Sequence, residues 1–254
     1  MAEPEIRVHA DADTLADAVA AAFVEAVARP VSPGRTGAQV HEVALTGGSI
    51  ARAIHRTIAR LAPAAGVQWS RVRLWWGDER FVASDSENRN VLQAQRDMLD
   101  ALRALPSGGL PDDNVMPVPS SDEVADVDAA ADVYSDLLRH EGTGAFDLVM
   151  LGVCPDGHVA SLFPGHPAAA ITDRIAVAVR DSPKPPPERV SLTFEALERA
   201  ERVWFVVAGT DKAEAVARAL ADEGSVTETP ARGVRGRTET VWWLDREAAA
   251  ALRR

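Results

Sequence analysis

The sequence predicts an α/β fold in which an open, mostly parallel sheet carries helices on both faces. Short apolar segments alternate with longer segments of helical spacing from one end of the chain to the other. No internal repeat interrupts the alternation. Such a pattern is typical of parallel strands joined by helical crossovers, which cover the sheet on both sides.

Short runs rich in Val, Leu, Ile and Trp, bounded by polar or glycine-containing turns, identify the strands. The run that ends in Trp75 and Trp76 is an example. In chain order, the predicted strands are residues 6–8, 40–45, 72–76, 146–151, 175–179, 190–193, 203–208 and 240–244.

Helices are predicted where apolar residues recur at every third or fourth position. Ile50, Ile54, Ile58 and Leu61 give this spacing after the second strand. Asn90 is the expected N-cap of the helix that follows the third strand. In chain order, the predicted helices are residues 14–28, 50–61, 90–102, 122–140, 211–221 and a terminal segment after residue 244.

We expect residues 1–254 to form one domain. A chain of 254 residues, 46% of them hydrophobic, can bury a full-sized core. The longest loop-like pieces, residues 29–39, 182–188 and 224–237, are too short to tether separate domains. No shift in composition marks a boundary.

Charge and composition exclude several classes of function. A net charge of −11 argues against nucleic-acid and anionic-membrane partners, because both need clustered Lys and Arg. No apolar run approaches the ~20 residues of a membrane span, and the first residues lack a signal-peptide pattern. The single cysteine excludes an internal disulfide and a Cys-rich zinc site. We therefore expect a cytoplasmic monomer that acts on a small molecule.

The most informative segment follows the strand at 146–151. A turn rich in Pro and Gly carries Asp156 and His158. Ligands of open α/β sheets bind at the carboxyl ends of the strands, which is where these side chains should emerge. An imidazole with a nearby carboxylate suits acid–base chemistry.

A second turn, Gly47-Gly48-Ser49, lies between the strand at 40–45 and the helix that follows. Glycines let backbone N–H groups face outward, and a helix N-terminus attracts anions, so the turn can hold a phosphate. The alternative is an ordinary turn with Ser49 as the helix N-cap. The turn matches neither a Walker A loop nor a dinucleotide-binding fingerprint.

Charged residues stand at three further positions beside predicted strands. Asp78 and Arg80 follow the strand at 72–76. They could form an ion pair that closes the end of the strand. Alternatively, Asp78 would orient a partner group and Arg80 would stabilise developing negative charge. Lys212 lies at a helix start, where the macrodipole disfavours a cation unless an anion binds nearby. Arg189 precedes the strand at 190–193, and it too has an ordinary surface role as the alternative.

A parallel sheet would bring the loops after four of these strands to one edge. Together they supply an imidazole, carboxylates, an arginine and a set of anion-binding groups. This combination indicates a site for a phosphorylated small molecule with acid–base chemistry.

The chain resembles the glucosamine-6-phosphate isomerase/6-phosphogluconolactonase family along nearly its whole length. The motifs are Thr-Gly-Gly-Ser at 46–49, Gly-Asp-Glu-Arg at 77–80, Pro-Asp-Gly-His-Val-Ala-Ser-Leu-Phe-Pro at 155–164, Glu-Arg-Val-Ser-Leu-Thr at 188–193, and the segment 209–216. Deaminase relatives usually have Asp-Glu-Tyr at 78–80 and Asn-Glu-Pro at 162–164, so the resemblance favours the lactonase branch. Cys154 and Ile50-Ala51 depart from the usual Gly and Thr-Pro, but neither departure removes a catalytic group.

The resemblance implies a Rossmann-like fold and hydrolysis of 6-phospho-D-glucono-1,5-lactone to 6-phosphogluconate in the pentose phosphate pathway. No cofactor and no metal would be needed. His158 would be the general base, held by Asp156 or Asp78, and Arg80 would oppose the oxyanion. The phosphate would be bound by Gly47, Gly48, Ser49, Arg189 and Lys212.

Other functions and other catalytic groups are also compatible with parts of the sequence. A sugar-phosphate isomerase or deaminase could use the same fold, whereas a sensor without turnover is disfavoured because no helix-turn-helix segment is present. Ser161 lacks the Gly-x-Ser-x-Gly context of a nucleophile, and a lone Cys154 is more often a small buried hydrophobe. The spacing of Asp156, His158 and His166 matches no common zinc site.

Overall fold

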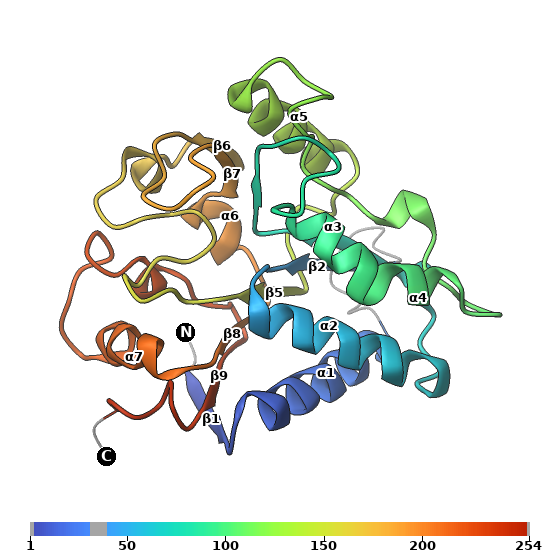
Figure 1. The fold of residues 1–254 in the computed structure, drawn as a ribbon, viewed down its shortest axis with the longest axis horizontal. Coiled ribbons are helices and arrows are strands. Elements are labelled where there is room, and N and C mark those ends of the chain that lie inside the picture. Colours follow the sequence, from blue (N-terminus) through green and yellow to red (C-terminus); the bar gives the residue numbers. More distant parts are fainter. Residues whose placement is uncertain (1–2, 31–39, 253–254) are drawn as a thin grey trace.

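The computed structural model describes residues 3–30 and 40–252 and confirms the α/β fold (Figure 1). A six-stranded sheet lies in the middle, in the order β1-β9-β8-β5-β2-β3, and all its neighbouring strands are parallel. Its strands are β1 (Glu5–His9), β2 (His41–Leu45), β3 (Val72–Trp76), β5 (Leu148–Leu151), β8 (Arg202–Val207) and β9 (Glu239–Asp245).

Helices cover both faces of this sheet, as predicted. The helices are α1 (Ala12–Ala28), α2 (Ser49–Leu61), α3 (Asn90–Ala94), α4 (Asp100–Arg103), α5 (Val127–His140), α6 (Phe194–Glu198) and α7 (Ala213–Leu220). A π-helical turn, Gln95–Leu99, joins α3 to α4, so the predicted helix at 90–102 is continuous but not α-helical throughout. Within the described residues, no helix combines the length and the apolar character needed to cross a bilayer.

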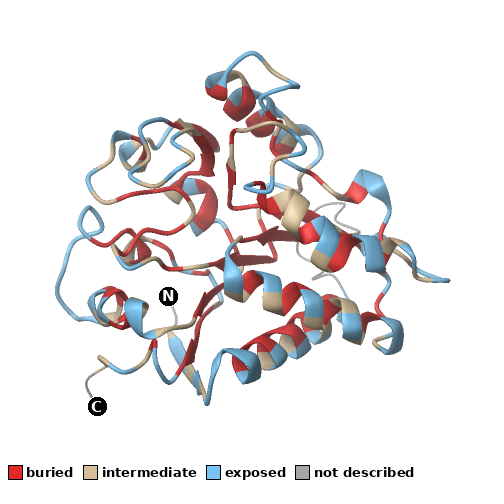
Figure 2. Ribbon diagram, viewed as in Figure 1, coloured by how far each residue is buried: buried red, intermediate tan, exposed pale blue. Residues whose placement is uncertain are grey.

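Alternation along the strands divides the core between the two faces. In β2, Val43 and Leu45 join the cluster under α1, α2 and α3, whereas Ala44 joins the cluster under α5, α6 and α7. Both clusters are apolar, which explains why the central strands are apolar at consecutive positions. The buried sides of α1 and α2 in Figure 2 face the sheet, and their exposed sides face solvent.

A second, three-stranded antiparallel sheet corrects part of the prediction. It has the order β4-β7-β6 and consists of β4 (Asp78–Arg80), β6 (Ala176–Val179) and β7 (Arg189–Leu192). The expected parallel arrangement is wrong for β6 and β7, because the nine residues between them are too few for a helical crossover. The charged segment at 78–80 is therefore a strand and not a turn.

Three helix predictions also need correction. Asn90 is not an N-cap: Arg89 occupies that position, and the carboxylate of Glu79 accepts the first helical N–H groups instead. Helix α5 begins at Val127, because the side chain of Asp126 caps it there. After β9, the described residues up to 252 form turns and not the expected helix. The predicted loop at 29–39 lies, from residue 31 on, outside the described residues.

Candidate active site

The loops after β2, β3, β5 and β8 meet at one edge of the sheet, because these four strands are adjacent and parallel. The edge carries a cavity of about 250 Å³. Strand order reverses between β5 and β2, and such a switch point is where open α/β sheets bind ligands. The lining includes every predicted site residue except Asp156: Gly47, Gly48, Ser49, Asp78, Arg80, His158, Arg189 and Lys212.

His158 lies on the turn after β5 and is 4% exposed. Its Nδ1 lies 2.7 Å from Asp156 Oδ1, and its ring packs on Phe163 with centroids 4.2 Å apart. An ionised carboxylate only accepts hydrogen bonds, so Nδ1 carries the proton and Nε2 is the basic nitrogen of the neutral ring. Asp156 therefore fixes both the tautomer and the orientation of the imidazole.

The same pair sets the charge of the site. Burial lowers the pKa of His158, but the hydrogen bond to Asp156 and the nearby Cys154 outweigh this, so its pKa lies above the ordinary value. Burial raises the pKa of Asp156, but the contact with His158 outweighs burial and brings the pKa to about 2. Asp156 is thus ionised at neutral pH.

Asp78 has a different environment. It begins β4 and is 7% exposed, and its Oδ2 accepts a hydrogen bond of 2.7 Å from Ser161 Oγ. The main-chain N–H of Ser161 in turn donates to Ser191 Oγ at 3.1 Å. The sequence left open whether Asp78 or Asp156 holds the imidazole, and in the structure Nδ1 of His158 pairs with Asp156.

The glycine turn after β2 is suited to bind an anion. Gly48 precedes α2 with φ of 96°, a conformation that favours glycine. Within the described residues, the N–H groups of Gly47 and Gly48 have no hydrogen-bond partner. Ser49 is the first residue of α2 and is exposed, and no side chain caps this helix. Gly47, Gly48 and Ser49 line the cavity, and unpaired N–H groups at a helix N-terminus favour a bound anion.

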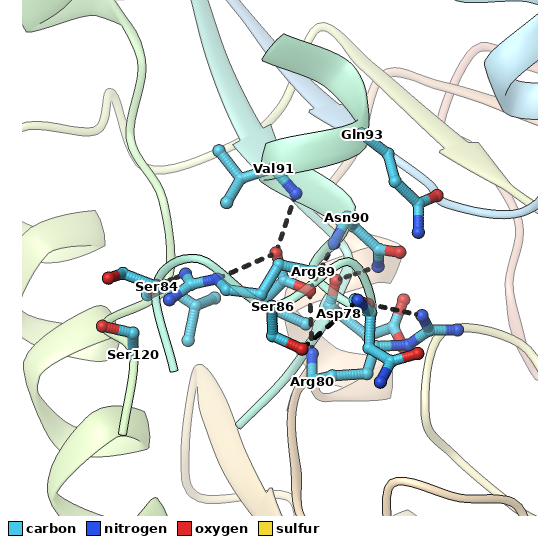
Figure 3. Close-up of polar contacts among 12 residues, drawn as sticks. Asp78, Arg80, Ser84, Ser86, Arg89, Asn90, Val91, Gln93 and Ser120 are labelled. Carbon is cyan, nitrogen blue, oxygen red and sulfur yellow. Dashed lines mark hydrogen bonds and ion pairs between the residues drawn. The ribbon is translucent and has the colours of Figure 1, made fainter. Parts of the chain in front are cut away.

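Cationic side chains surround the cavity. Arg80 Nη1 donates to the carbonyl of Asn88 at 2.8 Å, which fixes the guanidinium next to Asp78 (Figure 3). Lys212 lies before α7 and is paired with Asp211. Arg189 is 3% exposed, and its guanidinium donates to the carbonyls of the segment that bears Lys184.

Sequence reasoning missed two cavity residues, Lys184 and Asn90. Lys184 lies in a Pro-rich loop that the sequence marked only as irregular, yet one signal was available. The chain has just two lysines, Lys184 and Lys212, and both line this cavity. Asn90 carried no comparable signal, because its turn position also suits a helix cap.

No metal centre can be assigned here. Among the residues that the structure describes, no group of three or more His, Cys, Asp or Glu side chains could hold a metal ion. His166 caps a short 3₁₀ turn, Pro167–Ala170, and its Nε2 contacts the carbonyl of Arg180. Cys154 is a free thiol of intermediate exposure at the cavity.

Fold and cavity together define a Rossmann-like α/β protein with a cationic small-molecule site. Residues 10–243 match the family described as glucosamine-6-phosphate isomerases/6-phosphogluconolactonase. The chain is 40% identical to a 6-phosphogluconolactonase of Streptomyces coelicolor, over 99% of this chain and 95% of that one. It is 39% identical to a 6-phosphogluconolactonase of Mycobacterium tuberculosis, over 97% and 98% of the two chains.

A solved structure of 6-phosphogluconolactonase from Trypanosoma cruzi superposes with a TM-score of 0.79 at 26% identity. The match covers 98% of this chain and 96% of that one. The chain belongs to the glucosamine-6-phosphate isomerase/6-phosphogluconolactonase family, which confirms the resemblance drawn from the motifs.

Proposed function

We propose that this protein hydrolyses 6-phospho-D-glucono-1,5-lactone to 6-phosphogluconate in the oxidative pentose phosphate pathway, with His158 as the general base. The observation that carries the proposal is the buried His158, paired with the half-buried Asp156, at a cavity lined by Arg80 and the glycine turn. Relatives at 39–40% identity over almost the whole chain carry the lactonase name.

The proposed reaction begins with water held near Nε2 of His158. The nitrogen takes a proton as the water oxygen attacks the lactone carbonyl carbon, and Asp156 stabilises the imidazolium that forms. The carbonyl oxygen becomes an oxyanion, which Arg80 stabilises. When the ring C–O bond breaks, His158 returns the proton to the leaving oxygen, and the product is an open-chain acid.

The phosphate end of the substrate supplies binding energy. It would lie on the N–H groups of the turn at Gly47 and Gly48, beside Lys212 and Arg189. Lys184, which lines the same cavity, adds a further cation. Binding energy from this remote group places the carbonyl against the base, and so it raises turnover as well as affinity.

A coupled assay tests the proposal. Freshly prepared lactone is the substrate, 6-phosphogluconate formation is followed through a dehydrogenase, and spontaneous hydrolysis is subtracted. Glucosamine 6-phosphate is the matched alternative substrate, with ammonia release as its signal. Lactone hydrolysis without ammonia release is expected, whereas ammonia release at a comparable rate would assign the protein to the deaminase branch.

The expected oligomeric state and location belong to the same proposal. We infer a cytoplasmic monomer that acts on a small sugar phosphate with no nucleic-acid or membrane partner. Light scattering after size-exclusion chromatography at assay concentration would report a mass of about 27 kDa for the monomer. A doubled mass would overturn that part of the proposal.

A further inference from the structure

Asn90 lies between the glycine turn after β2 and the start of strand β4, two segments that line the cavity. It is the first residue of α3 and is 3% exposed, but its side chain reaches the cavity. Its Nδ2 donates to the main-chain carbonyl of Asp78 at 2.9 Å. Figure 3 shows Asn90 beside Asp78, above the strand that carries Arg80.

The other side of the same amide packs against Gly47. A Cβ atom on Gly47 would lie 2.0 Å from Asn90 Oδ1 and 2.5 Å from its Cγ. Unlike Gly48, Gly47 does not have a positive φ, so no left-handed backbone conformation demands glycine there. The carboxamide of Asn90 is therefore what requires glycine at position 47.

Stability alone does not account for an amide at this position. Asn90 Oδ1 is buried and has no hydrogen-bond partner among the described residues. An unpaired buried acceptor destabilises a fold, and such groups call for a functional explanation. The hydrogen bond from Nδ2 to the carbonyl of Asp78 accounts for one end of the amide, but no contact within the described residues accounts for Oδ1.

The main chain of Asn90 is held as firmly as its side chain. Glu79 accepts the N–H groups of Asn90 at 2.7 Å, Val91 at 2.9 Å and Arg80 at 2.8 Å. The Glu79 carboxylate is buried and lies 3.9 Å from the buried Arg89 guanidinium. Strand β4 and helix α3 are thereby fixed to each other, with the main chain of Asn90 at their junction.

We infer that Asn90 is a positioning residue that couples the phosphate-binding turn to the catalytic strand. Its amide sets the distance between Gly47, at the turn, and Asp78, at the start of β4. The inference rests on the proposed function for the roles of these two segments. Loss of the amide should disturb substrate binding and turnover together, because both segments lose the same support.

Kinetics of Asn90→Ala and Asn90→Asp test this role. Misplacement of reacting groups by about 1 Å costs about 100-fold, so kcat/KM should fall by about that factor, divided between a lower kcat and a higher KM. Asn90→Asp should not rescue activity, because its carboxylate cannot donate to the carbonyl of Asp78. Calorimetric affinity for 6-phosphogluconate should fall in both variants.

Asn114→Ala is the matched control. Asn114 is also buried, and its Nδ2 also donates to one main-chain carbonyl, that of Ser70 at 3.0 Å, but it does not line the cavity. Asn114→Ala should lower the Tm, while its kcat/KM stays within about twofold of the wild-type value. If Asn90→Ala behaves like this control, or changes only kcat or only KM, the coupling role is refuted. A wild-type enzyme inactive on the lactone would instead refute the proposed function.

A double-mutant cycle tests the contact itself. Gly47→Ala, Asn90→Ala and the double variant are compared in product affinity, with circular dichroism to establish that each is folded. The three heavy atoms nearest to the added methyl of Gly47→Ala all belong to the Asn90 amide. The loss of product affinity caused by Gly47→Ala should therefore be smaller when the amide is absent. If the free-energy losses of the two single variants add up to that of the double variant, the two residues do not interact, and the inference is overturned.

Discussion

Asp156→Asn is the most informative single change for the proposed mechanism. It keeps the size of the side chain but removes the carboxylate that accepts the hydrogen bond from Nδ1 of His158, 2.7 Å away. An amide can present either oxygen or nitrogen to the ring, so the tautomer that leaves Nε2 basic is no longer enforced. The imidazolium formed during catalysis also loses its counter-charge.

The size of the effect follows from the geometry. A hydrogen bond to a charged group contributes about 1.5–3 kcal/mol. The Asp156 side chain is 34% exposed, so solvent weakens the interaction and the lower part of that range applies. About 1.5–2 kcal/mol corresponds to a fall in kcat/KM of about 10- to 30-fold.

The dependence of activity on pH supplies a second test, in which the direction of the shift is predicted. Protonated His158 cannot accept a proton from water, so activity should rise with pH through the His158 pKa, which lies above its usual value. Asp156→Asn removes the carboxylate that contributes most to raising the pKa of His158. The ring stays buried, and burial lowers its pKa. The acid limb should therefore move to lower pH.

Rates measured with the coupled lactone assay from pH 5 to 8, corrected for spontaneous hydrolysis at each pH, check both effects. His158→Asn should lose about 100-fold or more at every pH, whereas His166→Asn, a change at the other histidine beside Phe163, should be nearly neutral. An acid limb that stays in place or moves to higher pH in Asp156→Asn would refute the assignment of the pair.

Three further results are expected. Arg80→Ala should lower kcat by about 100-fold or more while calorimetric product affinity changes little, because the guanidinium opposes charge that develops only in the transition state. Lys212→Ala and Lys184→Ala should each weaken product affinity by about tenfold or more, and unchanged affinity would place the phosphate elsewhere. Burial lowers the pKa of His55 to about 4, so its contribution to stability is complete above pH 6.5 and is lost as pH falls toward 4. In urea unfolding, His55→Leu should remove about 3 kcal/mol of the change in unfolding free energy between these pH values. The same change in both proteins would refute the role assigned to His55.

The sequence predicted the central sheet well because its strands, apart from the exposed edge strand β1, are buried on both faces. Apolar runs such as the one at β3 have no competing interpretation when helices follow at regular intervals. The antiparallel sheet was missed for the opposite reason. Strand β4 is the charged segment Asp78–Arg80, and its pairing with β7 depends on a register between residues about 110 positions apart, which local pattern cannot reveal.

Site residues were predictable where a side chain has no structural reason for its position. Lys212 next to a helix start and His158 on a tight turn are examples, and both line the cavity. Asn90 and Lys184 were not predictable in this way, because an Asn at a helix start and a Lys in a Pro-rich loop agree with local preferences.

Composition offers a signal that local pattern lacks. This chain has 27 basic residues, of which 25 are arginine, so arginine serves at ordinary surface positions such as the ion pair of Arg174 with Asp132. The two lysines come from segments 28 residues apart, yet they meet at one cavity. A lysine presents a compact charge on a flexible stem, whereas an arginine presents a rigid planar fork. Under the proposed function, a compact charge at each of these positions would suit the phosphate of the ligand, and we expect that Lys184→Arg does not restore the affinity that Lys184→Ala loses.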